Sequence, residues 1–470
     1  MKNIDRRRFL QLAGGGTLAA GVLASSGCST LPTAQQARPN IVFLLTDDQR
    51  WDTLGCMGNP IVRTPNMDHL ANNGVLFSNA FVTTSICCSS RASIFTGQYS
   101  RRHGVHNFST PFSQEALVNT YPMLLRSAGY RTGFIGKYGV GGAKDLPVDK
   151  YDYFKGFAGQ GKYEHKDAEG NYKHLTSMMG DQALEFLQGC TKGQPFCLSV
   201  SFKAPHCQDG DPRQFIYDRA LEDLYKDDTI PLPETATEDY FNRLPDFLRN
   251  SEARNRWKIR FADEQMRQNS VKAYYRLITG VDNAIGRIRA QLGQSGLADN
   301  TVIILIGDNG FYLGEHGLAG KWFGHEESVR VPLFIYDPRV GARRRGQRRS
   351  EIALNIDIAP TILGFAGVDA PKGMHGRDLS SPTRAKTKKR RKDFLYEHLF
   401  AHPAIAKSEG VIGGRYKYLR YIEREPVYEE LYDLQTDPHE TRNLAGNVEY
   451  RRLLEDLRKR CNVLIEEAKG

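Results

Sequence analysis

Residues 40–48 read NIVFLLTDD, a continuous apolar run that ends in two aspartates. Such a run predicts a strand that is buried on both faces, as in the centre of a mainly parallel sheet. The pattern recurs at 132–136, 196–202 and 301–306, and helical patterns lie between these runs at 67–73, 90–96, 121–128 and 271–292. This alternation predicts an α/β fold with a doubly wound, mostly parallel sheet flanked by helices.

Each predicted strand is followed by residues that can do chemistry. In chain order these are Asp47-Asp48, Lys137, Pro205-His206 and Asp308-Asn309. In doubly wound sheets, ligands bind beyond the carboxyl ends of the strands, so these side chains are expected to converge. Oxygen donors favour Ca²⁺ or Mg²⁺ over zinc. Taken alone, however, Asp47-Asp48 also fits a solvated turn or helix cap, and Asp308-Asn309 an ordinary turn.

Residues 87–97 read CCSSRASIFTG. This stretch resembles the signature of type I sulfatases, in which a cysteine is followed by proline, serine and arginine and then by Thr-Gly. The family oxidises that cysteine to formylglycine, and the position of Arg91 identifies Cys87 as the equivalent residue. Ser89 replaces the usual proline, and Gln98 the usual arginine after Thr-Gly. The alternative interpretation is a buried cysteine pair before a helix.

The resemblance extends from about residue 38 to 445 and implies the alkaline phosphatase superfamily fold. It implies a metal site formed by Asp47, Asp48, Cys87, Asp308 and Asn309. It also implies a catalytic set of Cys87, Arg91, Lys137, His206 and Lys321, in which the two lysines bind the sulfate and the histidine lies near the leaving group. The family histidine two positions after the first lysine is replaced by Gly139.

The chemistry of these residues fits a sulfatase. A hydrated formylglycine carries two hydroxyls on one carbon: one attacks sulfur with help from a metal, and the other later allows sulfate to be expelled. His206 can protonate the leaving alcohol near neutral pH, and Lys137 and Lys321 can stabilise charge on the sulfate oxygens. Formylglycine from Cys87 and Ca²⁺, with Mg²⁺ as the alternative ion, are therefore the expected cofactors.

The first 28 residues are predicted to be a signal for export. Arg6, Arg7 and Arg8 precede an apolar run from Leu12 to Ala24, which resembles a twin-arginine signal. Gly27-Cys28 resembles a lipoprotein cleavage site, which implies lipidation of Cys28 and attachment to a membrane. Residues 29–39 are expected to form a tether, and the protein is expected in the periplasm or anchored to its membrane.

The formal net charge of the 470-residue chain is +10, and basic runs at 343–349 and 384–392 account for it. They are interpreted as solvated loops or as a surface for a polyanion, for which sulfated glycan is favoured because no nucleic-acid-binding signature accompanies them. The second run marks a predicted boundary between a catalytic domain at 40–383 and a smaller α+β subdomain at 393–470. The subdomain is expected to contain hairpin strands at 411–421, a strand at 430–434 and a terminal helix at 450–468.

The sequence therefore predicts an exported sulfuric ester hydrolase, with sulfated polysaccharide or oligosaccharide as the expected substrate. Its expected partner is a formylglycine-generating or anaerobic sulfatase-maturating enzyme. One alternative is a formylglycine-dependent phosphodiesterase or phosphonate monoester hydrolase, because both substrates are tetrahedral oxyanions. The other is a non-catalytic glycan-binding lipoprotein in which Cys87 stays unmodified.

Overall fold

The computed structural model describes residues 38–341, 345–380 and 390–470. This part of the chain contains an eight-stranded sheet in the order β13-β2-β12-β9-β1-β8-β4-β5. Its strands are β1 (Asn40–Asp47), β2 (Val75–Phe77), β4 (Arg131–Lys137), β5 (Tyr153–Phe157), β8 (Phe196–Pro205), β9 (Thr301–Gly307), β12 (Leu333–Tyr336) and β13 (Gln347–Arg349). The four predicted strands are thus the central strands β1, β4, β8 and β9.

Strand β1 lies between β8 and β9 and pairs in parallel with both, so that Leu44 stands opposite Val200 and Leu305. Strand β4 continues the parallel order on the far side of β8. Strand β12 runs antiparallel to its neighbours β9 and β2. The predicted α/β fold with a mostly parallel sheet is therefore confirmed, with β12 as the strand of opposite direction.

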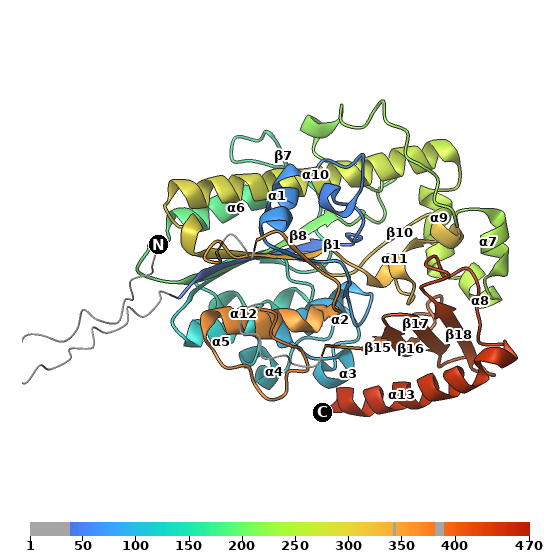
Figure 1. Cartoon of the computed structure of the whole chain (residues 1–470). Helices are drawn as coiled ribbons and strands as arrows, with labels where there is room; N and C mark the ends of the chain where they lie inside the picture. The colour runs from blue at the N-terminus through green and yellow to red at the C-terminus, as the bar shows by residue number, and fades with distance from the viewer. Residues whose placement is uncertain (1–37, 342–344, 381–389) are drawn as a thin grey trace, which may run out of the picture. The chain divides into compact units, whose positions relative to one another are not determined.

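Helices cover both faces of the sheet (Figure 1). Side chains alternate along β1, so Val42 and Leu44 pack in one apolar core and Ile41, Phe43 and Leu45 in another. The helices of the first core are α1 (Pro65–Asn73), α6 (Leu175–Gln188) and α10 (Glu264–Gln294). Those of the second are α2 (Cys87–Thr96), α5 (Tyr121–Ser127) and α12 (Ile358–Ala366).

A second sheet is formed near the C-terminus. It is antiparallel in the order β15-β16-β17-β18, with strands β15 (Asp393–His398), β16 (Ser408–Gly413), β17 (Tyr416–Tyr421) and β18 (Tyr428–Asp433). Helix α13 (Arg451–Lys469) packs on this sheet through Leu454, Cys461 and Leu464, which meet Leu395 and Val411 in one apolar cluster (Figure 1). These are the hairpin, strand and terminal helix expected for the smaller subdomain, whose exact limits remain predictions.

Shorter strands and helices lie between these elements along the chain. The strands are β3 (Ala80–Phe81), β6 (Glu164–Lys166), β7 (Tyr172–His174), β10 (Tyr312–Leu313), β11 (Ala319–Gly320) and β14 (Ala353–Leu354). The helices are α3 (Ser100–His103), α4 (Gln114–Val118), α7 (Glu238–Arg243), α8 (Asp246–Arg249), α9 (Glu252–Arg260) and α11 (Glu326–Val329).

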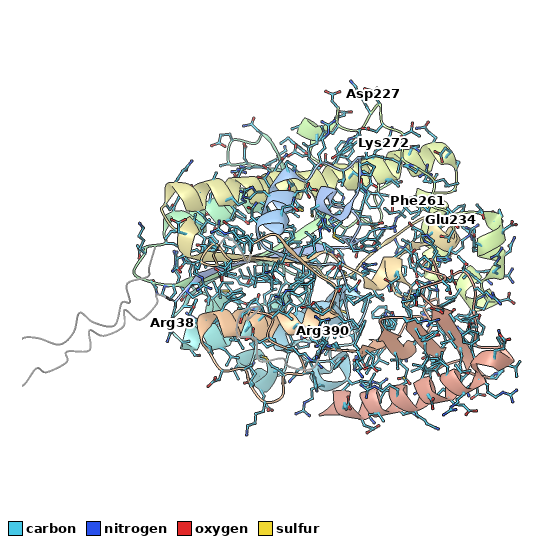
Figure 2. The ribbon with its side chains drawn as sticks, in the orientation of Figure 1. Arg38, Asp227, Glu234, Phe261, Lys272 and Arg390 are labelled. Carbon is cyan, nitrogen blue, oxygen red and sulfur yellow. The ribbon has the colours of Figure 1, made fainter. Side chains whose placement is uncertain are left out.

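Side chains fill the space between the sheet and its helices, as Figure 2 shows. In the described ranges, no helix has both the length and the apolar character that crossing a membrane requires. The predicted signal, its Cys28 and nearly all of the tether lie outside these ranges.

Candidate active site

Strand β1 ends in Asp47 and leads into Asp48, whose backbone is left-handed with a φ of 65°. A non-glycine residue pays about 1–2 kcal/mol for this conformation, which persists only when its surroundings enforce it. Two bonds do so here: the Asp48 amide donates to Asp308 Oδ1 at 3.1 Å, and the Tyr274 hydroxyl donates to the Asp48 carbonyl at 2.6 Å. The turn holds both carboxylates at the end of the sheet.

The second acidic pair follows β9, the parallel neighbour of β1. The Asp308 amide donates to the Thr46 carbonyl at 2.9 Å, which aligns the two strand ends. Asn309 Nδ2 then donates to Asp48 Oδ1 at 2.6 Å. The structure thus brings Asp47, Asp48, Asp308 and Asn309 together, although 260 residues separate the two pairs along the chain.

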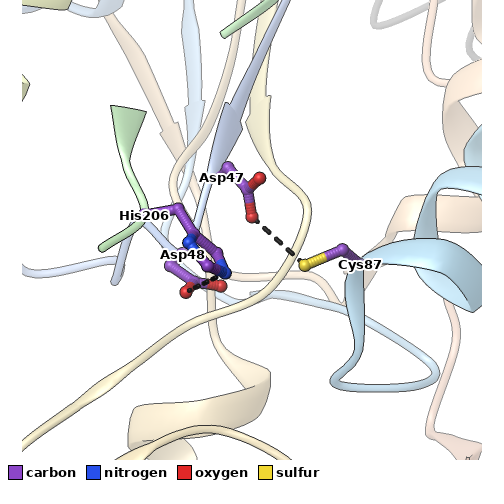
Figure 3. A group of neighbouring side chains, drawn as sticks. All are labelled: Asp47, Asp48, Cys87 and His206. Carbon is purple, nitrogen blue, oxygen red and sulfur yellow. Dashed lines mark hydrogen bonds and ion pairs between the residues drawn. The ribbon is translucent and has the colours of Figure 1, made fainter. Parts of the chain in front are cut away.

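Cys87 begins helix α2, which is buried along its whole length. Its thiol donates to Asp47 Oδ1 at 3.2 Å, and Lys321 Nζ donates to its sulfur at 2.9 Å. Figure 3 shows the sulfur pointing towards Asp47, with Asp48 and His206 beside them. Position 87 therefore faces the aspartates, as the resemblance implies for the nucleophile.

Arg91 lies one helical turn after Cys87 and is fully buried. Its Nε donates to Asp308 Oδ2 at 2.8 Å, and its Nη2 lies 3.3 Å from Asp47 Oδ2. Nη1 donates to the Lys137 carbonyl at 2.7 Å and to Ser201 Oγ at 2.5 Å. The guanidinium therefore links the ends of β1 and β4 to Ser201 within β8 and to Asp308 just after β9, and it orients two carboxylates, which suits its planar, multidentate geometry.

The two predicted sulfate-binding lysines reach the site from different strands. Lys137 ends β4, and its Nζ donates to Asp47 Oδ2 at 2.5 Å. Lys321 follows β11 and pairs with Asp48 Oδ1. Burial would lower the pKa of each lysine, but Asp47 raises that of Lys137 and Asp48 raises that of Lys321. Both amines are therefore held as buried cations, Lys321 against the Cys87 sulfur and Lys137 against Asp47.

His206 follows strand β8 and lies against Asp48, with 3.5 Å between its Nε2 and Asp48 Oδ2. Its Nδ1 lies 2.5 Å from the Cys207 carbonyl and donates to it. Burial holds the pKa of His206 well below its usual range, although Asp47 opposes the shift. With Nδ1 committed to the backbone, Nε2 is the nitrogen that faces the site.

The carboxylates differ in their electrostatics. Burial alone would raise the pKa of Asp47, but Lys137, His206, Arg91 and Lys321 hold it well below its usual range. The pKa of Asp308 rises to about 7, because burial and the nearby charge of Asp47 outweigh Arg91. Crowded carboxylates of this kind lose their mutual repulsion when a cation lies among them.

The donors present fit a divalent cation. Asp47, Asp48, Cys87 and His206 place one ligand atom each within 4.8 Å of one another. Asn309 Oδ1 is buried and has no hydrogen-bond partner in the described part of the chain. Such an orphaned acceptor beside three carboxylates matches the oxygen-rich coordination of Ca²⁺ or Mg²⁺.

The departures from the family pattern have local explanations. Gly139 has a φ of +79°, and a Cβ built on it would lie 2.4 Å from Arg91 Cδ, so Arg91 occupies the space next to it. The described residues that contact the Cys87 sulfur are instead Lys321 and Asp47. Ser89 Oγ donates to the Val105 carbonyl at 2.7 Å, and Gln98 Nε2 to the Gly373 carbonyl at 3.1 Å. The changed residues are thus accommodated by new bonds.

Sequence reasoning missed three polar residues around the site. Gln160 Oε1 accepts from Lys137 Nζ at 2.7 Å, Ser201 holds Arg91, and Tyr274 holds the Asp48 turn. Ser201 could have been found, because it precedes Pro205-His206 on the same strand. Gln160 lies in a loop without a recognisable pattern, and Tyr274 reads as an ordinary aromatic residue of a buried helix.

Comparison with protein families gives two matches. A family model described as "Sulfatase" matches residues 39–368, and one described as "N-sulphoglucosamine sulphohydrolase, C-terminal" matches residues 314–467. The first covers most of the α/β domain and the second the small sheet with its helix.

Individual relatives that match along most of the chain are also named as sulfatases. The chain is 29% identical to an N-acetylglucosamine-6-O-sulfatase of Bacteroides thetaiotaomicron, over 94% of this chain and 88% of that protein. It is 27% identical to the N-acetylglucosamine-6-sulfatase of Homo sapiens, over 88% of this chain and 82% of the relative. A solved structure bound to D-glucosamine-2-N,6-O-disulfate superposes with a TM-score of 0.78 at 26% identity, over 92% of this chain and 98% of that one.

A phosphonate monoester hydrolase of Silicibacter pomeroyi shares the fold. Its TM-score is 0.76 at 21% identity, over 90% of this chain and 94% of that one.

Proposed function

This chain belongs to the sulfatase family of the alkaline phosphatase superfamily, and on that premise we propose that it removes sulfate from carbohydrates with a formylglycine made from Cys87. As a family member it is a sulfuric ester hydrolase. The observation that carries the proposal is the position of the Cys87 sulfur between Lys321 Nζ and Asp47 Oδ1. A nucleophile in this place has a cation and a carboxylate within contact distance.

The side chains around position 87 have different roles in the proposed reaction. Lys137 and Lys321 supply positive charge for the sulfate oxygens, where charge shifts in the transition state. Arg91 fixes Asp47 and Asp308. His206 Nε2 exchanges a proton with the leaving alcohol, because Nδ1 is already bonded to the Cys207 carbonyl. When present, formylglycine supplies a hydrated aldehyde with two hydroxyls on one carbon.

Asp47, Asp48, Asp308 and Asn309 would hold the metal, and we propose Ca²⁺, with Mg²⁺ as the alternative. Four oxygen-bearing side chains from two strand ends suit the flexible, oxygen-rich coordination of Ca²⁺. The ion would lower the pKa of the reacting hydroxyl at position 87.

For the substrate, we propose the 6-sulfate of N-acetylglucosamine or a related amino sugar. Two relatives that match along most of this chain are named for N-acetylglucosamine 6-sulfate, and the superposed structure contains a glucosamine disulfate. The parent glycan would be a sulfated polysaccharide or one of its oligosaccharides.

Export, membrane anchoring and maturation are further parts of the proposal. The N-terminal sequence supports a twin-arginine signal and lipidation at Cys28, and hence a periplasmic or membrane-anchored protein. A formylglycine-generating or anaerobic sulfatase-maturating enzyme would act on Cys87. Because Ser89 replaces the usual proline, co-expression with each of these two enzymes should show which one converts Cys87.

Two measurements test the function. Peptide mass spectrometry should find Cys87 converted from thiol to aldehyde, and a non-catalytic glycan-binding protein would instead keep the thiol. The purified, converted enzyme should hydrolyse N-acetylglucosamine 6-sulfate and an aryl sulfate. A rate for an aryl phosphodiester that exceeds the aryl sulfate rate by about a hundredfold, or about 2.7 kcal/mol in barrier, would reverse the choice of ester.

A further inference from the structure

An exposed carboxylate stands next to the histidine of the leaving-group side. A ring nitrogen of His206, the Cys207 sulfur and one Asp209 oxygen all lie within 4.8 Å of one another. Unlike His206, which is almost fully buried, the Asp209 side chain is 42% exposed. Asp209 therefore reaches the surface next to the histidine that the family resemblance places near the leaving group.

Within the described part of the chain, the hydrogen bonds of the Asp209 side chain all fall on one of its two oxygens. Oδ1 accepts from Arg260 Nη2 at 2.8 Å, from the Cys207 thiol at 3.4 Å and from Arg256 Nη1. Oδ2 has no partner among the residues that the structure describes. Two guanidiniums on Oδ1 make this group a poor place for a cation, so the free oxygen is an acceptor for a neutral donor such as a hydroxyl.

The two arginines differ in exposure. Arg260 is 2% exposed and is anchored by Gln214 Oε1, which accepts from its Nε at 2.9 Å. Arg256 is 27% exposed, and Glu252 Oε1 accepts from its Nε at 2.6 Å. Arg260 thus holds the Asp209 carboxylate from the buried side, while the partly exposed guanidinium of Arg256 lies beside the same carboxylate at the surface.

We propose that Asp209 and Arg256 form a sugar subsite that binds ring hydroxyls of the residue carrying the sulfate. A sugar hydroxyl both donates and accepts, so a carboxylate beside a guanidinium matches it, whereas an aryl ring offers no such group. In this proposal the two lysines near Cys87 bind the sulfate, and Asp209 and Arg256 bind the sugar on the other side of the ester oxygen. The proposal rests on the carbohydrate sulfatase function proposed above and names residues that would make the enzyme prefer a sugar.

The test compares two substrates and two carboxylates of the same loop. Asp209→Ala should lower kcat/KM for N-acetylglucosamine 6-sulfate by about 10- to 100-fold, mostly through KM, because a hydrogen bond to a charged group is lost. The same variant should hydrolyse 4-nitrophenyl sulfate within about twofold of the wild-type rate. Asp211→Ala is the matched control, since Asp211 pairs with Arg213.

Each outcome decides the proposal. An equal loss on both substrates, or an unchanged value for the sugar, overturns the subsite while leaving the sulfatase function intact. A wild-type enzyme that cleaves the aryl sulfate but none of a panel of sugar sulfates overturns the subsite together with the carbohydrate substrate. Arg256→Met must shift sugar turnover in the same direction as Asp209→Ala, and Asp209→Asn provides the readout if the alanine variant fails to fold.

Discussion

Two buried clusters of charged residues have a similar composition but differ in the contacts that their lysines make. The cluster proposed to be catalytic, called the catalytic cluster below, consists of Cys87 with Asp47, Lys137 and Lys321. The Lys417 cluster lies on strand β17, where Lys417 Nζ is 2.7 Å from Glu440 Oε1, 2.9 Å from Glu326 Oε1 and 2.9 Å from the Gly324 carbonyl oxygen. Both have fully buried lysines among carboxylates.

The clusters differ in what their cations meet. Lys417 donates a hydrogen bond to the Gly324 carbonyl and forms ion pairs with Glu326 and Glu440, so its contacts are a backbone oxygen and two carboxylates. Lys321 donates instead to the sulfur of Cys87. Asn309, which shares Asp48 Oδ1 with Lys321, has an Oδ1 without a hydrogen-bond partner among the described residues. Buried charge alone therefore does not identify an active site. A reactive atom in contact with the buried cation is what distinguishes the Cys87 cluster.

The largest expected effect is that of Cys87→Ala. Removing the formylglycine precursor should lower turnover of an aryl sulfate by about four orders of magnitude or more, as for other nucleophile deletions. The free energy of unfolding should change far less, because little buried volume is lost. Cys88→Ala, in the neighbouring buried position, is the control, and residual activity of Cys87→Ala near that of the control would remove Cys87 from the mechanism.

Lys417→Met should produce the opposite result. It leaves Glu440 buried without its cation, which costs about 3–5 kcal/mol of stability. Folded Lys417→Met should retain its kcat/KM, whereas Lys137→Met should lose turnover by about 10²–10³-fold. Denaturant unfolding and initial rates measure the two quantities, and a folded Lys417→Met enzyme without activity would break the distinction between the clusters.

Calcium should raise the free energy of unfolding through the catalytic cluster and not through the Lys417 cluster. In Cys87→Ala protein treated with a chelator, Ca²⁺ at a hundred times its dissociation constant should add about 2.7 kcal/mol of stability. Thermal unfolding measures this without any turnover. Lys417→Met introduced into that background should keep the calcium effect and Asp308→Asn should lose most of it, so an equal shift in both would contradict the assignment of the ligands.

A smaller effect concerns pH at the edge of the Lys417 cluster. Burial raises the pKa of Glu430 to about 8, although the Tyr421 hydroxyl opposes the shift. The folded state then keeps a proton that the unfolded state releases above about pH 4.5, so stability falls as pH rises towards 8. Glu430→Gln should flatten this slope by up to about 1.4 kcal/mol per pH unit, measured by unfolding at pH 5 and pH 8. A stability that rises over this range would contradict the sign.

Much of this arrangement could be predicted from the sequence. Strands β1 and β9 are continuous apolar runs, and each ends in polar residues, so their pairing explains why Asp308 reaches Asp48. The family resemblance identified Cys87 and the lysines. The contact between Lys137 and Gln160, in contrast, depends on how a loop folds back over 23 residues. Asp209 and Lys417 likewise acquire meaning only from partners that packing brings to them.

Gly139 constrains how this chain could change. A side chain there would displace Arg91, whose contacts link β1, β4 and β8 to Asp308, the residue that follows β9. Restoring the family histidine by a single substitution would therefore disturb the whole end of the sheet before adding a new contact. Evolution or engineering would have to reposition Arg91 before it replaced Gly139, so the order of these two changes matters as much as the changes themselves.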